Sequence, residues 1–216
     1  FEVTSSAPDR TSTEQSGWPG DITRGSGISV LGTNLKFINV VVHDLSRGFE
    51  ISSAALNVEV YGSLVYYNGW EGPDRVPNGH GIDTRNRTGT RRLIDNIVFR
   101  QFSHGIIAYS SPEDRVDNMF LEGNILFDNG ALGKNRFERD VLIGGGSLAR
   151  NPVVRANSTY GGAQTAIGQG TGCAGALIED NYFVGGSPLV LGPCDAVVKG
   201  NTLFGAGTDG ASAAFL

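Results

Sequence analysis

The feature that most limits the fold of this chain is a repeated pattern of short apolar segments. Residues 57–69 (NVEVYGSLVYYNG) align with residues 118–130 (NMFLEGNILFDNG), with their asparagines and glycines in register. The pattern recurs more loosely at 35–44, 96–105, 153–162, 177–186 and 197–206. Self-similarity of this kind is typical of repeat architectures, in which each unit buries its apolar face only against its neighbours.

Each repeat consists of a short alternating segment, a turn residue and a second short segment. The turn residue is Asn at positions 39, 124, 157, 181 and 201. Asn tolerates the left-handed backbone conformation that such a turn needs, so we expect these residues to adopt it. Stacked Asn side chains can also hydrogen-bond along the axis of a repeat, which predicts an amide ladder.

A third short segment follows each pair and often begins with His-Gly. It occurs at residues 47–52, 80–85, 104–109 and 139–144. Three strands in a repeat of about 22 residues describe one coil of a solenoid. The composition fits, because a thin solenoid core needs few apolar residues and many turns: 39% of residues are hydrophobic and 32 of 216 are glycine.

These repeats resemble the right-handed parallel β-helix, and more specifically the pectate-lyase-like superfamily of carbohydrate-active proteins. The resemblance covers residues 27–206. It implies an all-β, single-stranded right-handed parallel β-helix of about seven to eight coils. We expect one β-helix domain over residues 1–216, either whole or as a fragment of a longer β-helix, with a less regular N-terminal segment over residues 1–26.

The two cysteines fit this arrangement. Cys173 and Cys194 precede the turn residues Asn181 and Asn201 by similar distances, which places them one coil apart. Adjacent strands lie about 4.8 Å apart, and this reaches the Cα range of a disulfide. We favour a disulfide over a stacked pair of buried thiols. A disulfide indicates an oxidising compartment, so we expect a secreted, periplasmic or otherwise extracellular protein.

Charge and hydropathy exclude two classes of function. The formal net charge is −5, which gives no basic footprint for nucleic-acid binding. No stretch of the sequence is apolar over 18 residues, so we expect no membrane span. An open end of a solenoid can pair with another chain, which leaves self-association through a terminal coil as a partner interaction.

Three longer loops lie beside the strands that begin with His-Gly. They cover residues 70–78, 86–92 and 131–139. Loops on a rigid scaffold commonly carry function. In the superfamily that this chain resembles, the substrate groove usually runs along this sheet between such loops. We therefore expect a polysaccharide or oligosaccharide to bind there.

Strand alternation sorts the side chains of this face into columns. The first contains Glu50, Asp83, Ile107 and Leu142; the second contains Ser52, Arg85, Tyr109 and Gly144; the corner contains Arg47, His80, His104 and Arg139. Carboxylates about 5 Å apart raise one pKa, as an acid/base pair requires. The candidate catalytic residues are Glu50, Asp83, His80, His104 and Tyr109. The candidate substrate-binding residues are Arg47, Arg85, Arg139 and, as a sugar platform, Trp70.

The first functional hypothesis is a lyase that cleaves a uronate-containing polysaccharide by β-elimination. His80 would be the base, Tyr109 or His104 the acid, and Arg85 the group that neutralises the substrate carboxylate. The alternatives are a glycoside hydrolase using Glu50 and Asp83, and a non-catalytic β-helix that binds carbohydrate or is structural. No cofactor is required, although Glu50, Asp83 and Asp74 together offer oxygen ligands suited to calcium.

Overall fold

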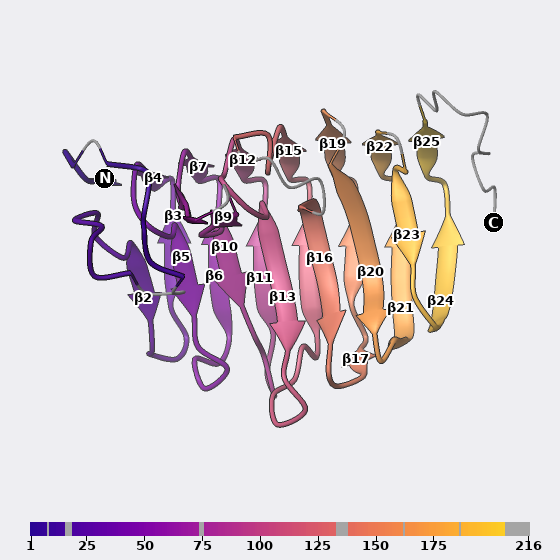
Figure 1. Ribbon diagram of the computed structural model, residues 1–216. Helices are drawn as coiled ribbons and strands as arrows, with labels where there is room; N and C mark the ends of the chain where they lie inside the picture. The colour runs from indigo at the N-terminus through magenta and orange to yellow at the C-terminus, as the bar shows by residue number, and fades with distance from the viewer. Residues whose placement is uncertain are drawn as a thin grey trace.

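The computed structural model describes residues 1–205, except residue 8, residues 16–18, 74–75 and 133–137, and residues 162 and 186. All regular structure in this part of the chain is β (Figure 1). Three long sheets contain parallel pairs alone, and the chain leaves one strand in each sheet before it begins the next coil. The protein is therefore a parallel β-helix, as the repeats predict.

The three long sheets and one hairpin are built as follows. Sheet 1 contains, in spatial order, β1 (Glu2–Thr4), β4 (Val41–His43), β7 (Leu64–Tyr66), β12 (Ile97–Phe99), β15 (Ile125–Phe127), β19 (Ser158–Tyr160), β22 (Tyr182–Val184) and β25 (Thr202–Phe204). Sheet 2 contains β2 (Ile28–Val30), β5 (Phe49–Ile51), β10 (Ile82–Thr84), β13 (Ile106–Ser110), β16 (Arg139–Gly145), β20 (Gln164–Gly170) and β23 (Leu189–Leu191). Sheet 3 contains β3 (Lys36–Ile38), β6 (Val58–Tyr61), β11 (Arg91–Ile94), β14 (Met119–Glu122), β18 (Val153–Arg155), β21 (Cys173–Glu179) and β17 (Ala149–Arg150), with β24 (Cys194–Lys199) also on β21. The antiparallel hairpin is β8 (Trp70–Glu71) with β9 (Pro77–Asn78).

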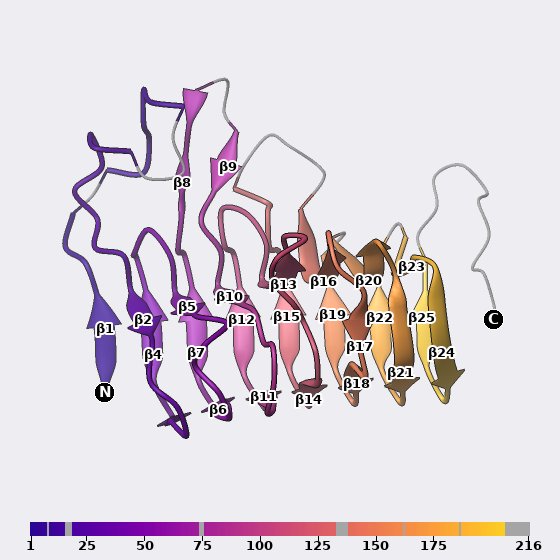
Figure 2. The same cartoon turned by 90° about the horizontal axis from the view of Figure 1, so that it is seen from below.

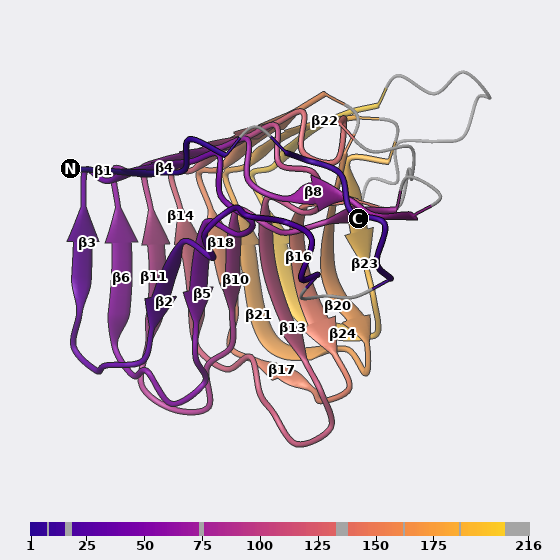
Figure 3. The same ribbon diagram turned by 60° about the vertical axis from the view of Figure 1, so that its left-hand side comes forward.

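Figure 3 shows sheets 2 and 3 as two faces of the solenoid, with strands of successive coils stacked along its axis. Alternation along each strand turns apolar side chains inward. Val65 on sheet 1, Ile82 on sheet 2 and Leu93 on sheet 3 are all 0% exposed. Equivalent residues of the neighbouring coils join them in one continuous apolar core, because each coil buries its apolar residues only against the next.

An amide ladder runs along the corner between sheets 3 and 1. The Nδ2 group of Asn96 donates to Oδ1 of Asn124 over 3.0 Å, and Asn124 donates in the same way to Asn157 over 2.9 Å. The ladder continues through Asn181 to Asn201 over 3.0 and 2.8 Å. The amide ladder predicted from the turn asparagines is therefore present.

The expected backbone conformation of these asparagines is wrong, except at Asn39, whose φ is 53°. In the later coils the left-handed residue is the one before the asparagine, for example Asp95 at 53° and Asp180 at 55°. The amide must point inward to meet its neighbours, so the preceding residue makes the turn. Asn is selected here for its two-sided hydrogen bonding rather than for its tolerance of positive φ.

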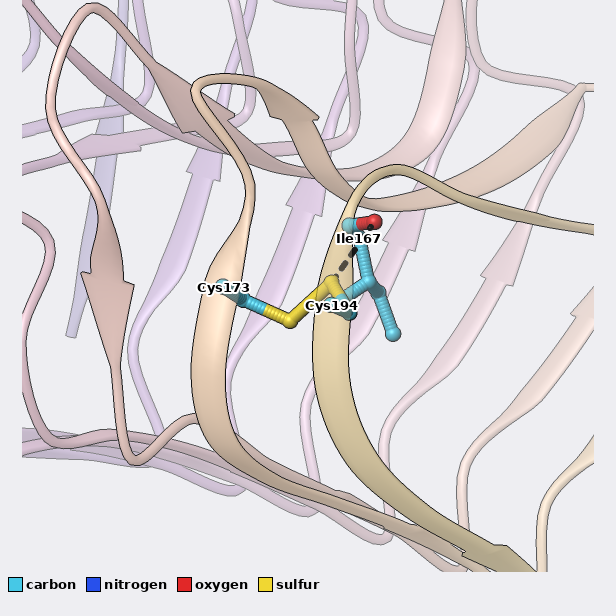
Figure 4. The surroundings of a disulfide bond; sticks show 3 residues. All are labelled: Ile167, Cys173 and Cys194. Atoms are coloured by element: carbon cyan, nitrogen blue, oxygen red, sulfur yellow. Dashed lines mark hydrogen bonds between the residues drawn. A yellow bond between two sulfur atoms is a disulfide. The ribbon is translucent and has the colours of Figure 1, made fainter.

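The structure joins Cys173 and Cys194 by a disulfide between β21 and β24, with a Cα–Cα distance of 4.4 Å (Figure 4). The Sγ atom of Cys194 lies 3.7 Å from the carbonyl oxygen of Ile167. A Cβ atom on Gly168 would lie 2.2 Å from that sulfur, so the bond fits only because residue 168 has no side chain. The disulfide ties together two of the last coils described.

The hairpin and the N-terminal segment lie together beside the solenoid (Figure 2). Thr11 forms a parallel bridge to Glu71 of β8, and Ser12 donates its backbone N–H to the carbonyl oxygen of Glu71 over 2.8 Å. The fully buried guanidinium of Arg24 donates to the carbonyl oxygen of Gly69 over 2.9 Å and pairs with a carboxylate. Residues 70–78, expected as a loop, therefore begin and end as paired strands.

Candidate functional site

The His-Gly corner of sheet 2 has a steric origin. A Cβ atom on Gly81 would lie 2.7 Å from the carbonyl oxygen of Gly105 in the next coil and 3.1 Å from Cδ of Gln101. Gly105 is constrained in the same way by the carbonyl oxygen of Asp140 and by the side chain of Asn129. The corner needs glycine because an inner amide row lies directly beneath it.

The corner column predicted from the sequence consists of the residues that precede Gly48, Gly81, Gly105 and Asp140. Gly48, Gly81 and Gly105 donate their backbone N–H groups to the carbonyl oxygens of His80, His104 and Arg139, over 3.0, 3.1 and 3.0 Å. The imidazole rings of His80 and His104 stack with centroids 5.2 Å apart and planes 14° from parallel. The column thus presents a guanidinium, two imidazoles and a second guanidinium on successive coils.

Both imidazoles are fixed by backbone donors. The backbone N–H of His104 donates to Nδ1 of His80 over 3.3 Å, and that of Arg139 donates to Nδ1 of His104 over 2.8 Å. A ring nitrogen that accepts a hydrogen bond carries no proton, so each neutral ring has its proton on Nε2. The two rings therefore present N–H donors rather than basic nitrogens.

The acidity of the two rings fits this assignment. Burial, reinforced by the charges of Arg47 and Arg85, lowers the pKa of His80 to about 3. Burial, with His80 and Arg139 nearby, lowers the pKa of His104 to about 3. Both rings stay neutral at ordinary pH, and as bases they are weak. This argues against the expected role of His80 as the general base.

The carboxylate column has the predicted register. Asp83 on β10 pairs directly with Glu50 on β5, and Ile107 and Leu142 follow on the next two coils. Asp83 is only 6% exposed although its side chain is on the outer face of sheet 2. The two carboxylates are therefore neighbours in different environments, since Glu50 is half-buried.

Two arginines flank Asp83. Arg47 Nη1 lies 3.8 Å from Oδ2 of Asp83 and 3.4 Å from Oε1 of Glu50, while Arg85 Nη1 lies 3.5 Å from Oδ1 of Asp83. Burial raises the pKa of Asp83 above its usual value, and the charges of Arg85 and Arg47 oppose that rise. Oδ1 of Asp83 accepts no hydrogen bond within the described part of the chain. Asp83 is thus a buried carboxylate that is paired by charge with two arginines, and its Oδ1 atom accepts no hydrogen bond from the described residues.

Tyr109 follows Arg85 along the next column. Arg85 Nε donates to the carbonyl oxygen of Tyr109 over 3.0 Å, and Tyr109 pairs with Gly144 of the following coil. The Tyr109 side chain is 39% exposed on the outer face of sheet 2. Its ring is therefore accessible to a ligand that lies on this sheet.

Two expected binding residues lie elsewhere. Trp70 is 1% exposed, because β8 lies between β9 and residues 10–12, so the expectation that its ring serves as a sugar platform is wrong. Arg139 is at the far end of the corner column, two coils beyond β10 and about 10 Å from it along the axis. The structure therefore gathers Arg47 and Arg85 at Asp83, but not Arg139.

Two residues that the sequence did not single out support this site. Arg91 is 0% exposed inside the solenoid, and its Nη2 group donates to the carbonyl oxygens of Arg85 and Ser52 over 2.8 and 3.1 Å. Asp114 lies 4.0 Å from Nε of Arg85. The alternation of residues 91–94 places Arg91 on the same inner face as Leu93, so the burial of Arg91 could be predicted from the sequence. Asp114 lies on a loop, where no periodic pattern predicts the position of its side chain.

The described residues contain no group of three or more His, Cys, Asp or Glu side chains arranged to hold a metal ion. Asp74, named as a calcium ligand together with Glu50 and Asp83, lies outside the described residues. The described part of the chain also contains no helix long and apolar enough to cross a membrane.

Comparison with known proteins gives a structural likeness but no match in sequence. No family model matches the sequence, and no curated protein matches it. A crystal structure of pectate lyase Pel9A is similar, with a TM-score of 0.49 and 18% sequence identity. The match covers 88% of this chain and 53% of that one, so this chain spans about half the length of the solved structure that it matches.

Proposed function

We propose that the outer face of sheet 2 binds an anionic, uronate-type polysaccharide and cleaves it by β-elimination, with Asp83 as the base. The observation that carries this proposal is that Asp83, a buried carboxylate whose pKa is raised by burial, is paired with two arginines on the outer face of the sheet. A base with a raised pKa and a cation that neutralises the substrate carboxylate are the two groups that β-elimination next to a carboxylate requires.

Substrate binding would itself prepare the base. A substrate carboxylate competes with Asp83 for Arg47 and Arg85, which Asp83 meets at 3.8 and 3.5 Å. Because both arginines lower the pKa of Asp83, their transfer to the substrate strengthens Asp83 as a base. Binding and activation are in this way one event.

The bond changes follow from these roles. Asp83 takes the proton from C5, the carbon next to the uronate carboxylate, and the C5–H electron pair forms a C4–C5 double bond. The C4–O bond breaks, and the departing oxygen takes a proton from water. The Nε2–H groups of the neutral His80 and His104 rings are donors that can stabilise negative charge on sugar oxygens.

A second function is favoured by the register itself. Asp83 lies directly opposite Glu50, and carboxylates of adjacent strands are spaced near the separation of about 5 Å found in retaining glycosidases. In that case Asp83, whose pKa is raised, would be the acid and Glu50 the nucleophile.

One assay separates the two reactions. The protein is incubated with polygalacturonate, alginate and glycosaminoglycans, and both ultraviolet absorbance and new reducing ends are measured. β-Elimination gives both signals on at least one polymer, because the new double bond is conjugated with the carboxylate. Reducing ends without absorbance favour the hydrolase. Binding without either signal favours a non-catalytic carbohydrate-binding protein.

The disulfide supports the further proposal that the protein works outside the cytosol, since such bonds persist in oxidising compartments.

A further inference from the structure

The imidazole of His43 lies between two carboxylates on the outer face of sheet 1. Alternation along β4 buries Val42 and turns His43 outward, where its ring stacks on that of Tyr66 with centroids 4.5 Å apart. Nδ1 of His43 lies 2.7 Å from Oδ2 of Asp44, and Nε2 lies 2.7 Å from Oε1 of Glu2. Because Glu2 belongs to β1, the ring adds a side-chain contact to the backbone pairing of β1 with β4.

These two distances fix the charge of the ring. A neutral imidazole has one N–H donor and one acceptor nitrogen, and an ionised carboxylate only accepts. Both ring nitrogens are within hydrogen-bond distance of a carboxylate oxygen, so only the doubly protonated imidazolium donates to both. Burial lowers the pKa of His43, but the hydrogen bonds and charges of Asp44 and Glu2 outweigh burial and hold that pKa above its usual value of 6.5. His43 therefore keeps its positive charge to a higher pH than an isolated histidine does.

Two uncharged side chains also face the ring, and neither titrates in this range. Oγ1 of Thr4 lies 3.4 Å from Nδ1 of His43 and has no charge to lose. Burial, with the charges of Asp44 and Glu2, raises the pKa of Tyr66 above its usual value of 10, so this phenol stays protonated while His43 titrates. A change with pH at this place therefore comes from His43.

The two carboxylates differ in the number of cations that they contact. Asp44 also pairs with Arg10 and with Arg24, whose Nη2 atom lies 2.9 Å from Oδ1 of Asp44. Within the described residues, His43 is the only cation paired with Glu2. Loss of the His43 proton thus leaves Asp44 with two arginines, while Glu2 keeps no cation among the described residues.

We propose that His43 is a proton-dependent anchor, which holds β1 on sheet 1 while its ring is charged and loosens β1 when the ring loses its proton. In the neutral ring one nitrogen presents its lone pair to a carboxylate, so one of the two hydrogen bonds is lost. The stabilisation of β1 is therefore complete below pH 6.5 and is lost as pH rises through the higher pKa of His43 in the folded protein. The contacts of Arg10 and Arg24 persist, because a guanidinium keeps its charge. The anchor lies on sheet 1 and is independent of the function proposed for sheet 2.

Hydrogen exchange of single backbone amides tests the anchor. The N–H of Val41 donates to the carbonyl oxygen of Phe1 over 3.0 Å, so its exchange reports the attachment of β1. The N–H of Leu64 donates to the carbonyl oxygen of Val40 over 2.9 Å and reports the next strand pair of the same sheet. Each rate is divided by the intrinsic rate of an unprotected amide at the same pH, which removes the direct effect of pH and leaves the protection of that amide.

The wild-type protein should show a local response. Between about pH 5 and about pH 9, we expect the protection of the Val41 amide to fall about three- to tenfold, as the loss of one partly exposed, charged hydrogen bond does. Protection of the Leu64 amide should change less than about twofold, and so should that of Ser12, whose N–H donates to Glu71 in the arginine-held part of the N-terminal segment. A nitrogen NMR titration of the His43 ring should give a pKa above 6.5.

Two variants should remove the pH dependence, and a third is the matched control. In Glu2→Gln and His43→Gln the contact between residues 2 and 43 no longer joins two charges, so protection of Val41 should be nearly the same at both pH values. The imidazole of Glu2→Gln should also have a lower pKa than that of the wild-type protein, because one of its two anionic partners is gone. Glu122→Gln removes a carboxylate that pairs with Arg155 at 2.9 Å on sheet 3, and should behave like the wild-type protein.

Four results would each overturn the anchor. They are constant protection of Val41 in the wild-type protein, an equal fall at Leu64, a fall in Glu2→Gln as large as in the wild-type protein, and a His43 ring that titrates at or below pH 6.5. Activity on polysaccharides plays no part in these measurements, so failure of the anchor and failure of the proposed function are distinguishable.

Discussion

The backbone N–H of Arg139 donates a hydrogen bond to Nδ1 of His104 over 2.8 Å. The backbone N–H of His104 donates to Nδ1 of His80 in the same way, so each coil fixes the imidazole of the coil before it. The arrangement makes both rings neutral donors through Nε2. In the proposed function the two rings therefore donate hydrogen bonds to oxygen atoms of the ligand and do not remove a proton.

This predicts a graded response at His80. His80→Gln keeps an N–H donor and should lower kcat/KM on the polyuronate substrate about two- to threefold, whereas His80→Ala should lower it about tenfold, the loss of one neutral hydrogen bond. Removal of a general base would instead cost about 100-fold or more in both variants. Initial rates of both variants, with thermal melting to confirm folding, check this prediction.

The pH profile provides the matching control. Because burial lowers the pKa of His80 and His104 to about 3, no limb of kcat/KM should follow a histidine near pH 6.5. A limb near pH 6.5 in the wild-type protein that disappears in His80→Gln would contradict the donor role.

Asp140 is expected to make stability fall as pH rises. It replaces the corner glycine in its coil and accepts a hydrogen bond from Nδ2 of Asn129 over 2.7 Å, while its Oδ2 atom has no partner within the described residues. Burial raises its pKa from 3.8 to about 7. Between these values the folded state binds more protons than the unfolded state, so this group's contribution to stability is present below pH 3.8 and lost as pH rises through 7.

Asp140→Asn should remove that dependence, because an amide still accepts from Asn129 and carries no charge. At pH 8 the variant should be more stable than the wild-type protein by about 1–4 kcal/mol, and at pH 4 the two should be nearly equal. Chemical denaturation at both pH values measures the difference. Equal stability of Asp140→Asn and the wild-type protein at pH 8 would show that burial does not destabilise the charged form of Asp140.

Reduction of the disulfide should loosen one end of the molecule only. Cys173 and Cys194 are separated by 21 residues, and a loop of that size is worth about 3 kcal/mol. In a solenoid each coil contacts only its neighbours, so the loss should stay local. Hydrogen exchange of Cys173→Ala/Cys194→Ala should be faster in β21 to β25 and unchanged in β6 to β12. Uniformly faster exchange would contradict this.

The repeats predicted much of the fold and the arrangement of its outer face. The alternation in HGIDTR was enough to place Asp83 beside Glu50, because a one-residue shift would have buried the charged set and exposed the apolar one. The glycine of the same motif fixed His80 at the corner. These features are local in sequence or repeat from coil to coil, which is why they could be read in advance.

The expectations that were wrong concern residues at which segments distant in the sequence meet. Trp70 is buried because residues 10–12 pair with β8, and nothing near Trp70 indicates that contact. The tautomers of His80 and His104 depend on backbone N–H groups of the following coil. The environment of Asp83 depends on Arg47 of the preceding coil as well as on Arg85 of its own coil. Burial and hydrogen-bond partners of this kind are set by tertiary structure and not by spacing.

The most direct test of the central claim is the initial rate of ultraviolet absorbance on a polyuronate, compared between the wild-type protein and Asp83→Asn. Asp117→Asn is the control, because Asp117 is also 6% exposed and pairs with an arginine, Arg115, at 3.6 Å, outside the site. The account predicts absorbance with the wild-type protein and Asp117→Asn, and a loss of about 100-fold or more with Asp83→Asn. Equal rates in Asp83→Asn and the wild-type protein, or no absorbance on any polyuronate, would contradict it.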